Sequence, residues 1–170
     1  MQKAKQRSEI AQQDKWRIED IYATDEAWEA DYDECIRRAK EKCVYQGRLA
    51  ESAQILYQAL KESDEADLLV EHVYVYAFMK YYEDTANAVY QEMSGRAQAA
   101  VTKLSEKYAF LTPEILAIDQ KKMQEYLTSD TLALYRHALE DMLAKKEHAL
   151  SETEEPLLAM ACLLYTSDAA

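Results

Sequence analysis

The stretch from Leu68 to Met79, which reads LLVEHVYVYAFM, decides the fold class of this chain. Its Val-Tyr-Val-Tyr centre alternates as a β-strand would, and branched and aromatic residues suit a pleated sheet. No second candidate strand lies nearby in the sequence to pair with it. We therefore interpret the stretch as part of a helix that begins at Ser63 or Asp64.

Turn-forming residues are scarce around this stretch and along the whole chain. The 170 residues contain two glycines, Gly47 and Gly95, and two prolines, Pro113 and Pro156. Such scarcity favours long helices joined by few tight turns. It also excludes a phosphate-binding loop, which needs several glycines close together.

Side chains that cap helices divide the chain further. Thr24 precedes two acidic residues that suit the positive end of a helix dipole, and Gly47 is expected near the end of that helix. Further helix starts are expected at Ser52, at Ser63 or Asp64, at Asp84-Thr85, at Thr112 with Pro113 at the first helical position, at Asp119, at Ser129 or Asp130, and at Ser151 or Thr153. The prediction is an all-α array of about seven helices with antiparallel hairpins.

Three segments are expected. Residues 1–14 are polar and predicted to fray, residues 15–161 form one helical lobe, and residues 162–170 are expected to be a non-native tail. Near the start of the lobe, Trp16 lies close to Ile18, Ile21 and Tyr22, which predicts a docking stretch with Trp16 as its buried anchor.

Charge and cysteine content exclude other classes of function. The net charge of −12 disfavours binding to nucleic acid, because an acidic chain repels phosphates. No run of about 18 apolar residues predicts a membrane span, and residues 1–13 do not resemble a secretory signal. Cys35, Cys43 and Cys162 show no paired spacing, which predicts free thiols in a reducing compartment.

Several side chains are candidates for chemistry, each with a simpler structural reading. An aromatic cluster could line a peptide channel or could pack between helices: Tyr74, Tyr76, Phe78, Tyr81 and Tyr82. His137 and Glu140 share a helix face but lack the further ligands of a metal site. We expect ordinary structural roles for His148, for the carboxylates of Glu152, Glu154 and Glu155, and for the thiols of Cys35 and Cys43.

Four blocks of sequence, in order, resemble oligoendopeptidase F of peptidase family M3. They are residues 16–22 (WRIEDIY), residues 45–49 (YQGRL) with Ser52, residues 74–77 with 84–87, 90–91 and 113–116, and residues 135–140 with 148–158. Ala149 departs from the His-Thr-Leu-Ser that the family usually shows. The resemblance covers about 145 residues, from Trp16 to Ala161.

The resemblance implies the N-terminal lobe of a cytoplasmic zinc metallopeptidase that hydrolyses short oligopeptides in a channel between helical lobes. Such enzymes hold zinc with His-Glu-x-x-His on one helix. Here His72, His137 and His148 are followed by Val73, Ala138 and Ala149, so we assign no catalytic, cofactor-binding or metal residue to this chain. Zinc and the catalytic lobe would belong to the intact parent enzyme. The alternative is a free-standing helical scaffold or adaptor that binds partner helices or peptides.

Overall fold

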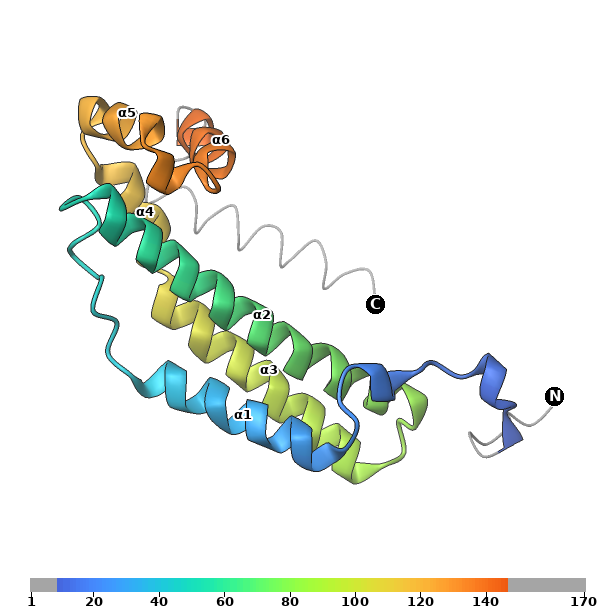
Figure 1. Cartoon of the computed structure of the whole chain (residues 1–170). Coiled ribbons are helices and arrows are strands. Elements are labelled where there is room, and N and C mark those ends of the chain that lie inside the picture. Colours follow the sequence, from blue (N-terminus) through green and yellow to red (C-terminus); the bar gives the residue numbers. More distant parts are fainter. Residues whose placement is uncertain (1–8, 147–170) are drawn as a thin grey trace, which may run out of the picture.

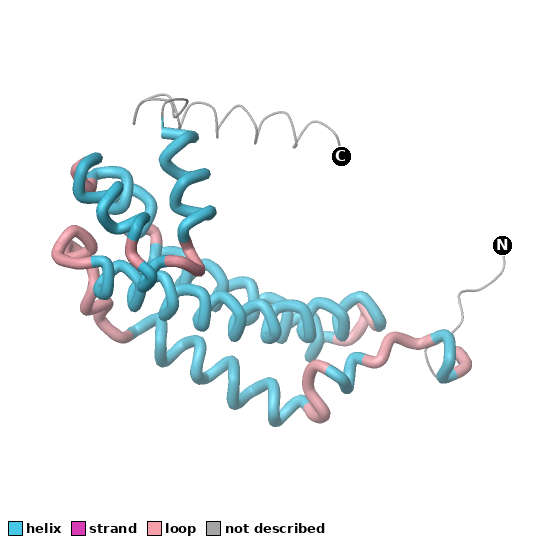
Figure 2. Tube along the Cα trace, turned by 45° about the horizontal axis from the view of Figure 1, so that its top comes forward, coloured by secondary structure: helices cyan, strands magenta, loops and turns pink. Residues whose placement is uncertain are grey.

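A computed structural model describes residues 9–146, and every regular element in that range is helical (Figure 2). This confirms the all-α prediction. The α-helices are α1 (Asp25–Lys40), α2 (Ala53–Glu83), α3 (Ala88–Tyr108), α4 (Leu111–Ala117), α5 (Gln120–Thr128) and α6 (Arg136–Lys146). Short 3-10 turns are η2 (Gln12–Asp14), η3 (Ile18–Asp20) and η4 (Asp130–Leu132). The predicted count of about seven therefore differs from the six α-helices in the described range, and the helix expected at Ser151 or Thr153 lies outside it.

The count differs chiefly because α2 is one continuous helix of 31 residues. The expected start at Ser63 or Asp64 is wrong, since Ser63 lies buried inside the helix. Its neighbours on the same side, Ala59, Ala66 and Val70, are buried too. Burial of this unbroken side outweighs a local capping signal, because tertiary packing supplies most of a helix's stability.

Three of the predicted helix starts are confirmed by hydrogen bonds of the capping side chains. Thr24 accepts from the backbone N–H of Ala27 at the start of α1, and Ser52 accepts from that of Ile55 at the start of α2. Asp119 accepts from two backbone N–H groups of α5. These bonds satisfy donors that the first turn of a helix leaves unpaired.

Other predicted boundaries are wrong. α1 ends at Lys40, well before Gly47, and Asn87 caps α3 where Asp84-Thr85 was expected to. α4 begins at Leu111, so Pro113 is the third helical residue, where its missing N–H costs no intrahelical bond. The start expected at Ser129 or Asp130 gives only the turn η4, and α6 begins at Arg136.

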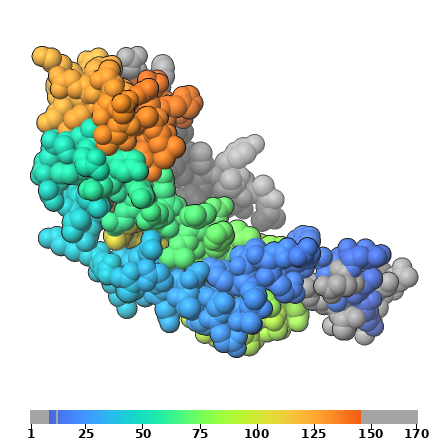
Figure 3. Space-filling model, viewed as in Figure 1, coloured from blue at the N-terminus to red at the C-terminus, as the bar shows by residue number. Residues whose placement is uncertain are grey.

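The three long helices lie side by side (Figure 1). α2 and α3 form an antiparallel hairpin, and α1 packs against both. α4, α5 and α6 gather at the end of the hairpin where α3 finishes, and in Figure 3 this orange part lies directly against the teal start of α2. The largest fully buried side chains come from nearly all of these elements: Trp28, Tyr76, Ile18, Leu49, Leu56, Leu104, Ile115, Met123, Leu132 and Leu139.

The segment between α1 and α2 is held by a carboxylate from α4. Glu114 accepts hydrogen bonds of 2.8 Å from the backbone N–H groups of Gly47 and Leu49. Gly47 has a φ of +81°, a left-handed conformation that glycine adopts without steric cost. The turn at Gly47 therefore places the buried Leu49 against the core instead of ending α1.

The N-terminal stretch docks on the long helices, but not through Trp16. Ile18 is fully buried, and the ring of Tyr22 meets that of Tyr76 edge-on with a centroid distance of 5.3 Å. Trp16 is 59% exposed, so the prediction that it anchors the stretch is wrong. Trp28 of α1 fills the core instead.

Candidate functional site

A row of aromatic side chains along α2 is the first candidate site. Tyr74, Phe78 and Tyr82 are spaced four residues apart, which places them on one side of the helix. Ring centroids are 4.2 Å apart for Tyr74 and Phe78, and 5.9 Å apart for Phe78 and Tyr82. Tyr81 adjoins the end of the row, 5.4 Å from Tyr82. We call these four residues the aromatic row.

Tyr76, the fifth member of the predicted cluster, has a different role. It is buried, and its hydroxyl donates to Asp25 Oδ1 over 2.7 Å. Burial, followed by this hydrogen bond and the charge of Asp25, raises the pKa of Tyr76 above its usual value. Tyr76 therefore packs between helices, which is the structural interpretation of the cluster, and its hydrogen bond joins α2 to α1.

The aromatic row lies outside the core cluster of the described residues. Its four members are neither among the core residues nor among the half-buried side chains that pack on them. Tyr82 is 64% exposed, and the tyrosine hydroxyls of the row form no hydrogen bond within residues 9–146. The row thus offers flat apolar rings with hydroxyl groups, a combination that suits a peptide backbone and its side chains.

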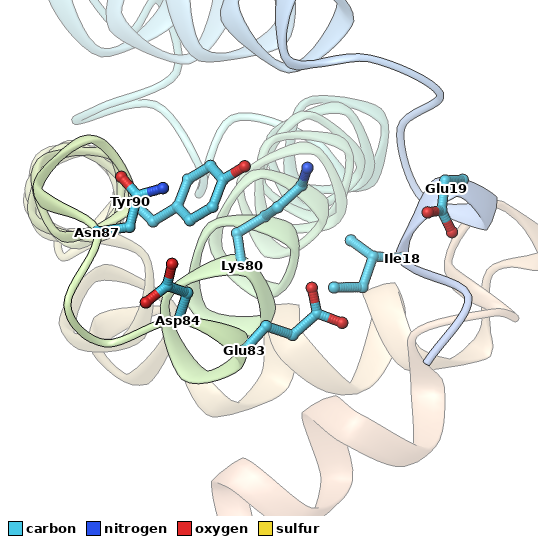
Figure 4. A pocket seen from close by; sticks show the side chains of 7 residues that line it. All are labelled: Ile18, Glu19, Lys80, Glu83, Asp84, Asn87 and Tyr90. Carbon is cyan, nitrogen blue, oxygen red and sulfur yellow. The ribbon is translucent and has the colours of Figure 1, made fainter. Parts of the chain in front are cut away.

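A second feature is a pocket of about 280 Å³ where the hairpin of α2 and α3 meets the N-terminal stretch (Figure 4). Its lining is Ile18, Glu19, Lys80, Glu83, Asp84, Asn87 and Tyr90. The ammonium of Lys80 lies 3.4 Å from Asp25 Oδ1 and about 5 Å from the ring centroids of Tyr76 and Tyr90. Lys80, the cation that lines this pocket, thus already contacts α1 and α3 from its position on α2.

The predicted histidine and cysteine candidates do not form a site. His137 and Glu140 are both exposed on α6, and no group of three possible metal ligands occurs within residues 9–146. The described residues therefore do not fit a catalytic zinc. Cys35 is buried, and desolvation raises its pKa to about 11, which disfavours the reactive thiolate. His148, Cys162 and the carboxylates at 152–155 lie outside the described range.

In the described part of the chain, no helix is both long enough and apolar enough to cross a lipid bilayer.

Comparisons with known proteins show that this chain is similar to oligopeptidases. A family model described as Oligopeptidase F matches residues 114–164. Oligopeptidase PepF of Bacillus subtilis (strain 168) is 39% identical over 156 residues, which are 91% of this chain and 23% of that protein. The Group B oligopeptidase PepB of Streptococcus agalactiae is 35% identical over 160 residues, covering 94% of this chain and 27% of that protein.

Solved structures share the fold. A crystal structure of oligoendopeptidase-F from Enterococcus faecium superposes with a TM-score of 0.68 at 29% identity, covering 83% of this chain and 27% of that one. A protein from Chlamydophila abortus has a TM-score of 0.78 at 24% identity, over 94% of this chain and 27% of that one. The second likeness supports the fold alone.

The fold and the matches together show that this helical chain is similar to part of several oligopeptidases. The particular relationship is to oligoendopeptidase F, which confirms the resemblance seen in the sequence and is consistent with an N-terminal segment. The chain spans about a quarter of the length of the curated relatives that it matches.

Proposed function

We propose that the chain is the N-terminal lobe of a cytoplasmic zinc metalloendopeptidase that hydrolyses short oligopeptides. The observation that supports this proposal is the similarity to oligopeptidases over more than nine-tenths of the chain, at 39% identity to PepF of Bacillus subtilis. The lobe walls a substrate channel and restricts access to it. The zinc and the catalytic residues come from the remaining lobe of the parent enzyme.

The aromatic row is the part of the lobe that we assign to the channel wall. Aromatic rings contact apolar side chains of a peptide, and phenolic hydroxyls donate to or accept from its backbone. We assign to this chain the binding and orientation of the peptide, and we assign its cleavage to the remaining lobe.

A chimera tests the proposal. The matched segment of PepF from Bacillus subtilis is replaced by this chain, and hydrolysis of a quenched fluorescent oligopeptide is measured with and without a chelator. We expect chelator-sensitive hydrolysis by the chimera and none by the 170-residue chain alone. A folded chimera without activity, or chelator-sensitive cleavage by the chain alone, would contradict the proposed role.

A free-standing helical module that binds partner helices or peptides is the second candidate. The observation that favours it is the aromatic row, which is not packed on the core of the described residues. The native gene beyond Ala161 separates the two candidates. A downstream His-Glu-x-x-His supports the peptidase, whereas a stop codon supports the module.

A further inference from the structure

The aromatic row continues into two carboxylates on the same side of α2. Asp67 and Glu71 precede Tyr74, Phe78 and Tyr82 with successive spacings of 4, 3, 4 and 4 residues. At 100° per residue, these five side chains leave the helix within a sector of about 80°. We call them the α2 stripe. Asp67 and Glu71 were not among the predicted site residues, although this spacing is visible in the sequence.

The stripe has two chemically distinct ends. Its C-terminal end carries aromatic rings, and its N-terminal end carries Asp67 and Glu71, both exposed and neither in an ion pair within residues 9–146. Leu68, beside the acidic end, is 58% exposed. A surface that joins unpaired carboxylates to aromatic rings favours a partner that carries both positive charge and apolar groups.

The electrostatics of Asp67 support a cationic partner. Although the residue is exposed as a whole, partial desolvation of its carboxylate, followed by the charges of Asp64 and Glu71, raises the pKa of Asp67. Asp64 is occupied, because it accepts a 2.7 Å hydrogen bond from the Tyr135 hydroxyl. An added ammonium or guanidinium near Asp67 would offset this repulsion, whereas an apolar helix would desolvate the carboxylates further.

We propose that the α2 stripe binds an extended oligopeptide, with a Lys or Arg side chain at Asp67 and Glu71 and apolar residues over the aromatic row. This inference rests on the proposed function and adds the charge class of the substrate. The stripe is about 22 Å long, since a helix rises about 1.5 Å per residue. An extended peptide of about seven residues has that length.

The test uses the 170-residue chain and two dye-labelled octapeptides that differ only in one residue, arginine or its neutral isostere citrulline. Binding is measured by fluorescence anisotropy. We expect the arginine peptide to bind about fivefold more tightly, as for one partly shielded ion pair, and the difference to shrink at high salt.

Matched variants locate the site. The double variant Asp67→Asn, Glu71→Gln should abolish the preference for arginine while the circular dichroism spectrum stays helical. The control Asp33→Asn, Glu125→Gln removes the same charge from exposed positions on α1 and α5 and should keep the preference. The variant Phe78→Ser, Tyr82→Ser should weaken both peptides about equally, because the rings contact groups that the peptides share.

Three results would overturn the inference: equal affinity for the two peptides, no binding of either, or an equal loss of preference in the control variant. The last would show a general effect of the acidic surface. An active PepF chimera without arginine preference would reject the charged site and leave the proposed function standing. An inactive chimera whose chain still prefers arginine would support the site but reject the peptidase lobe.

Discussion

Trp28 is the residue that most directly joins two of the long helices. Its indole N–H donates to the backbone carbonyl of Val73 on α2 over 2.8 Å, and its side chain is fully buried. Its ring also stacks on Tyr32, with centroids 5.3 Å apart. Removing this side chain would leave a large cavity between α1 and α2.

We expect Trp28→Ala to lower the free energy of unfolding by ~3–5 kcal/mol, the usual cost of truncating a buried aromatic residue. Trp16→Ala should change it by about 0.5 kcal/mol or less, since Trp16 is exposed. Urea unfolding followed by circular dichroism measures both. Similar losses in the two variants would show that Trp16 is also an anchor.

Arg96 is a second single residue that links two long helices, here α3 and α1. Its guanidinium makes two hydrogen bonds, of 2.6 and 2.5 Å, to the carboxylate of Glu29 on α1. The same guanidinium lies 4.2 Å from the ring centroid of Tyr32 and 5.2 Å from that of Trp28. The planar guanidinium of arginine can make both hydrogen bonds to the carboxylate and stack on the rings at the same time, whereas the ammonium of lysine cannot.

Arg96→Lys should therefore cost ~1–2 kcal/mol of stability, from the lost second hydrogen bond and the weaker ring contact. Arg48→Lys is the control, because the partners of Arg48 within residues 9–146, the carboxylate of Glu51 and the backbone carbonyl of Val44, both lie in its own segment of the chain. That change should cost less than about 0.5 kcal/mol. Equal chemical denaturation midpoints for the two variants would contradict a stabilising link between α3 and α1 through Arg96.

At the scale of elements, a side chain of α3 satisfies part of the C-terminal end of α1. The ammonium of Lys107 on α3 is largely buried and donates to the carbonyl of Arg38 in the last turn of α1 over 2.9 Å. A cation suits that position because the C-terminal end of a helix carries partial negative charge and unpaired carbonyls. The helix thus ends before Gly47 with its terminal carbonyls partly satisfied from α3.

The two glycines should respond oppositely to alanine. Gly95 lies in the interior of α3, with no atom within 4 Å of an added Cβ, so Gly95→Ala should stabilise the chain by ~0.5–1 kcal/mol. Gly47 has a left-handed backbone, so Gly47→Ala should destabilise it by ~1–2 kcal/mol despite the open space. The midpoint of thermal unfolding distinguishes the two variants. A shift of this midpoint in the same direction for both would refute the assigned backbone conformations.

For the whole molecule, bonds from tyrosine hydroxyls to carboxylates tie the elements together. The chain has 13 tyrosines, and within residues 9–146 four of them donate to a carboxylate in another part of the chain over 2.7 or 2.8 Å. The pairs are Tyr22 with Asp31, Tyr76 with Asp25, Tyr108 with Glu62, and Tyr135 with Asp64. They join the segment after η3 to α1, α1 to α2, α2 to α3, and α2 to the segment before α6.

These bonds predict a loss of stability at alkaline pH. Burial, followed by the hydrogen bond and charge of the carboxylate, raises the pKa of each of the four phenols above the usual value of 10.0. In the unfolded chain these phenols ionise near that value, whereas the folded chain keeps their protons. Stability is therefore full below about pH 10 and falls as the pH rises further.

Urea midpoints at neutral pH and at about pH 11 test this expectation. The double variant Tyr22→Phe, Tyr76→Phe cannot ionise at two of the four sites and should lose less stability between the two pH values. A loss as large in the variant as in the original chain would assign the alkaline transition to other groups.

The sequence by itself determined the helical class and several helix starts. The scarcity of glycine and proline, the capping side chains Thr24, Ser52 and Asp119, and the ordered resemblance to oligoendopeptidase F are local or linear properties. They depend on bonds within one turn or on the order of residues along the chain, so no tertiary contact is needed to read them. The absence of a zinc-binding motif was visible in the same way.

Only the tertiary structure decided which aromatic residue is buried between helices and which lies outside the core. Tyr74 and Tyr76 are two positions apart, but helical rotation turns Tyr76 toward α1 and Tyr74 into the aromatic row. Likewise, packing against α3 carries α2 through Ser63, and Trp28 takes the buried place expected for Trp16. Burial depends on what lies across from a side chain, and that neighbour is distant in the sequence.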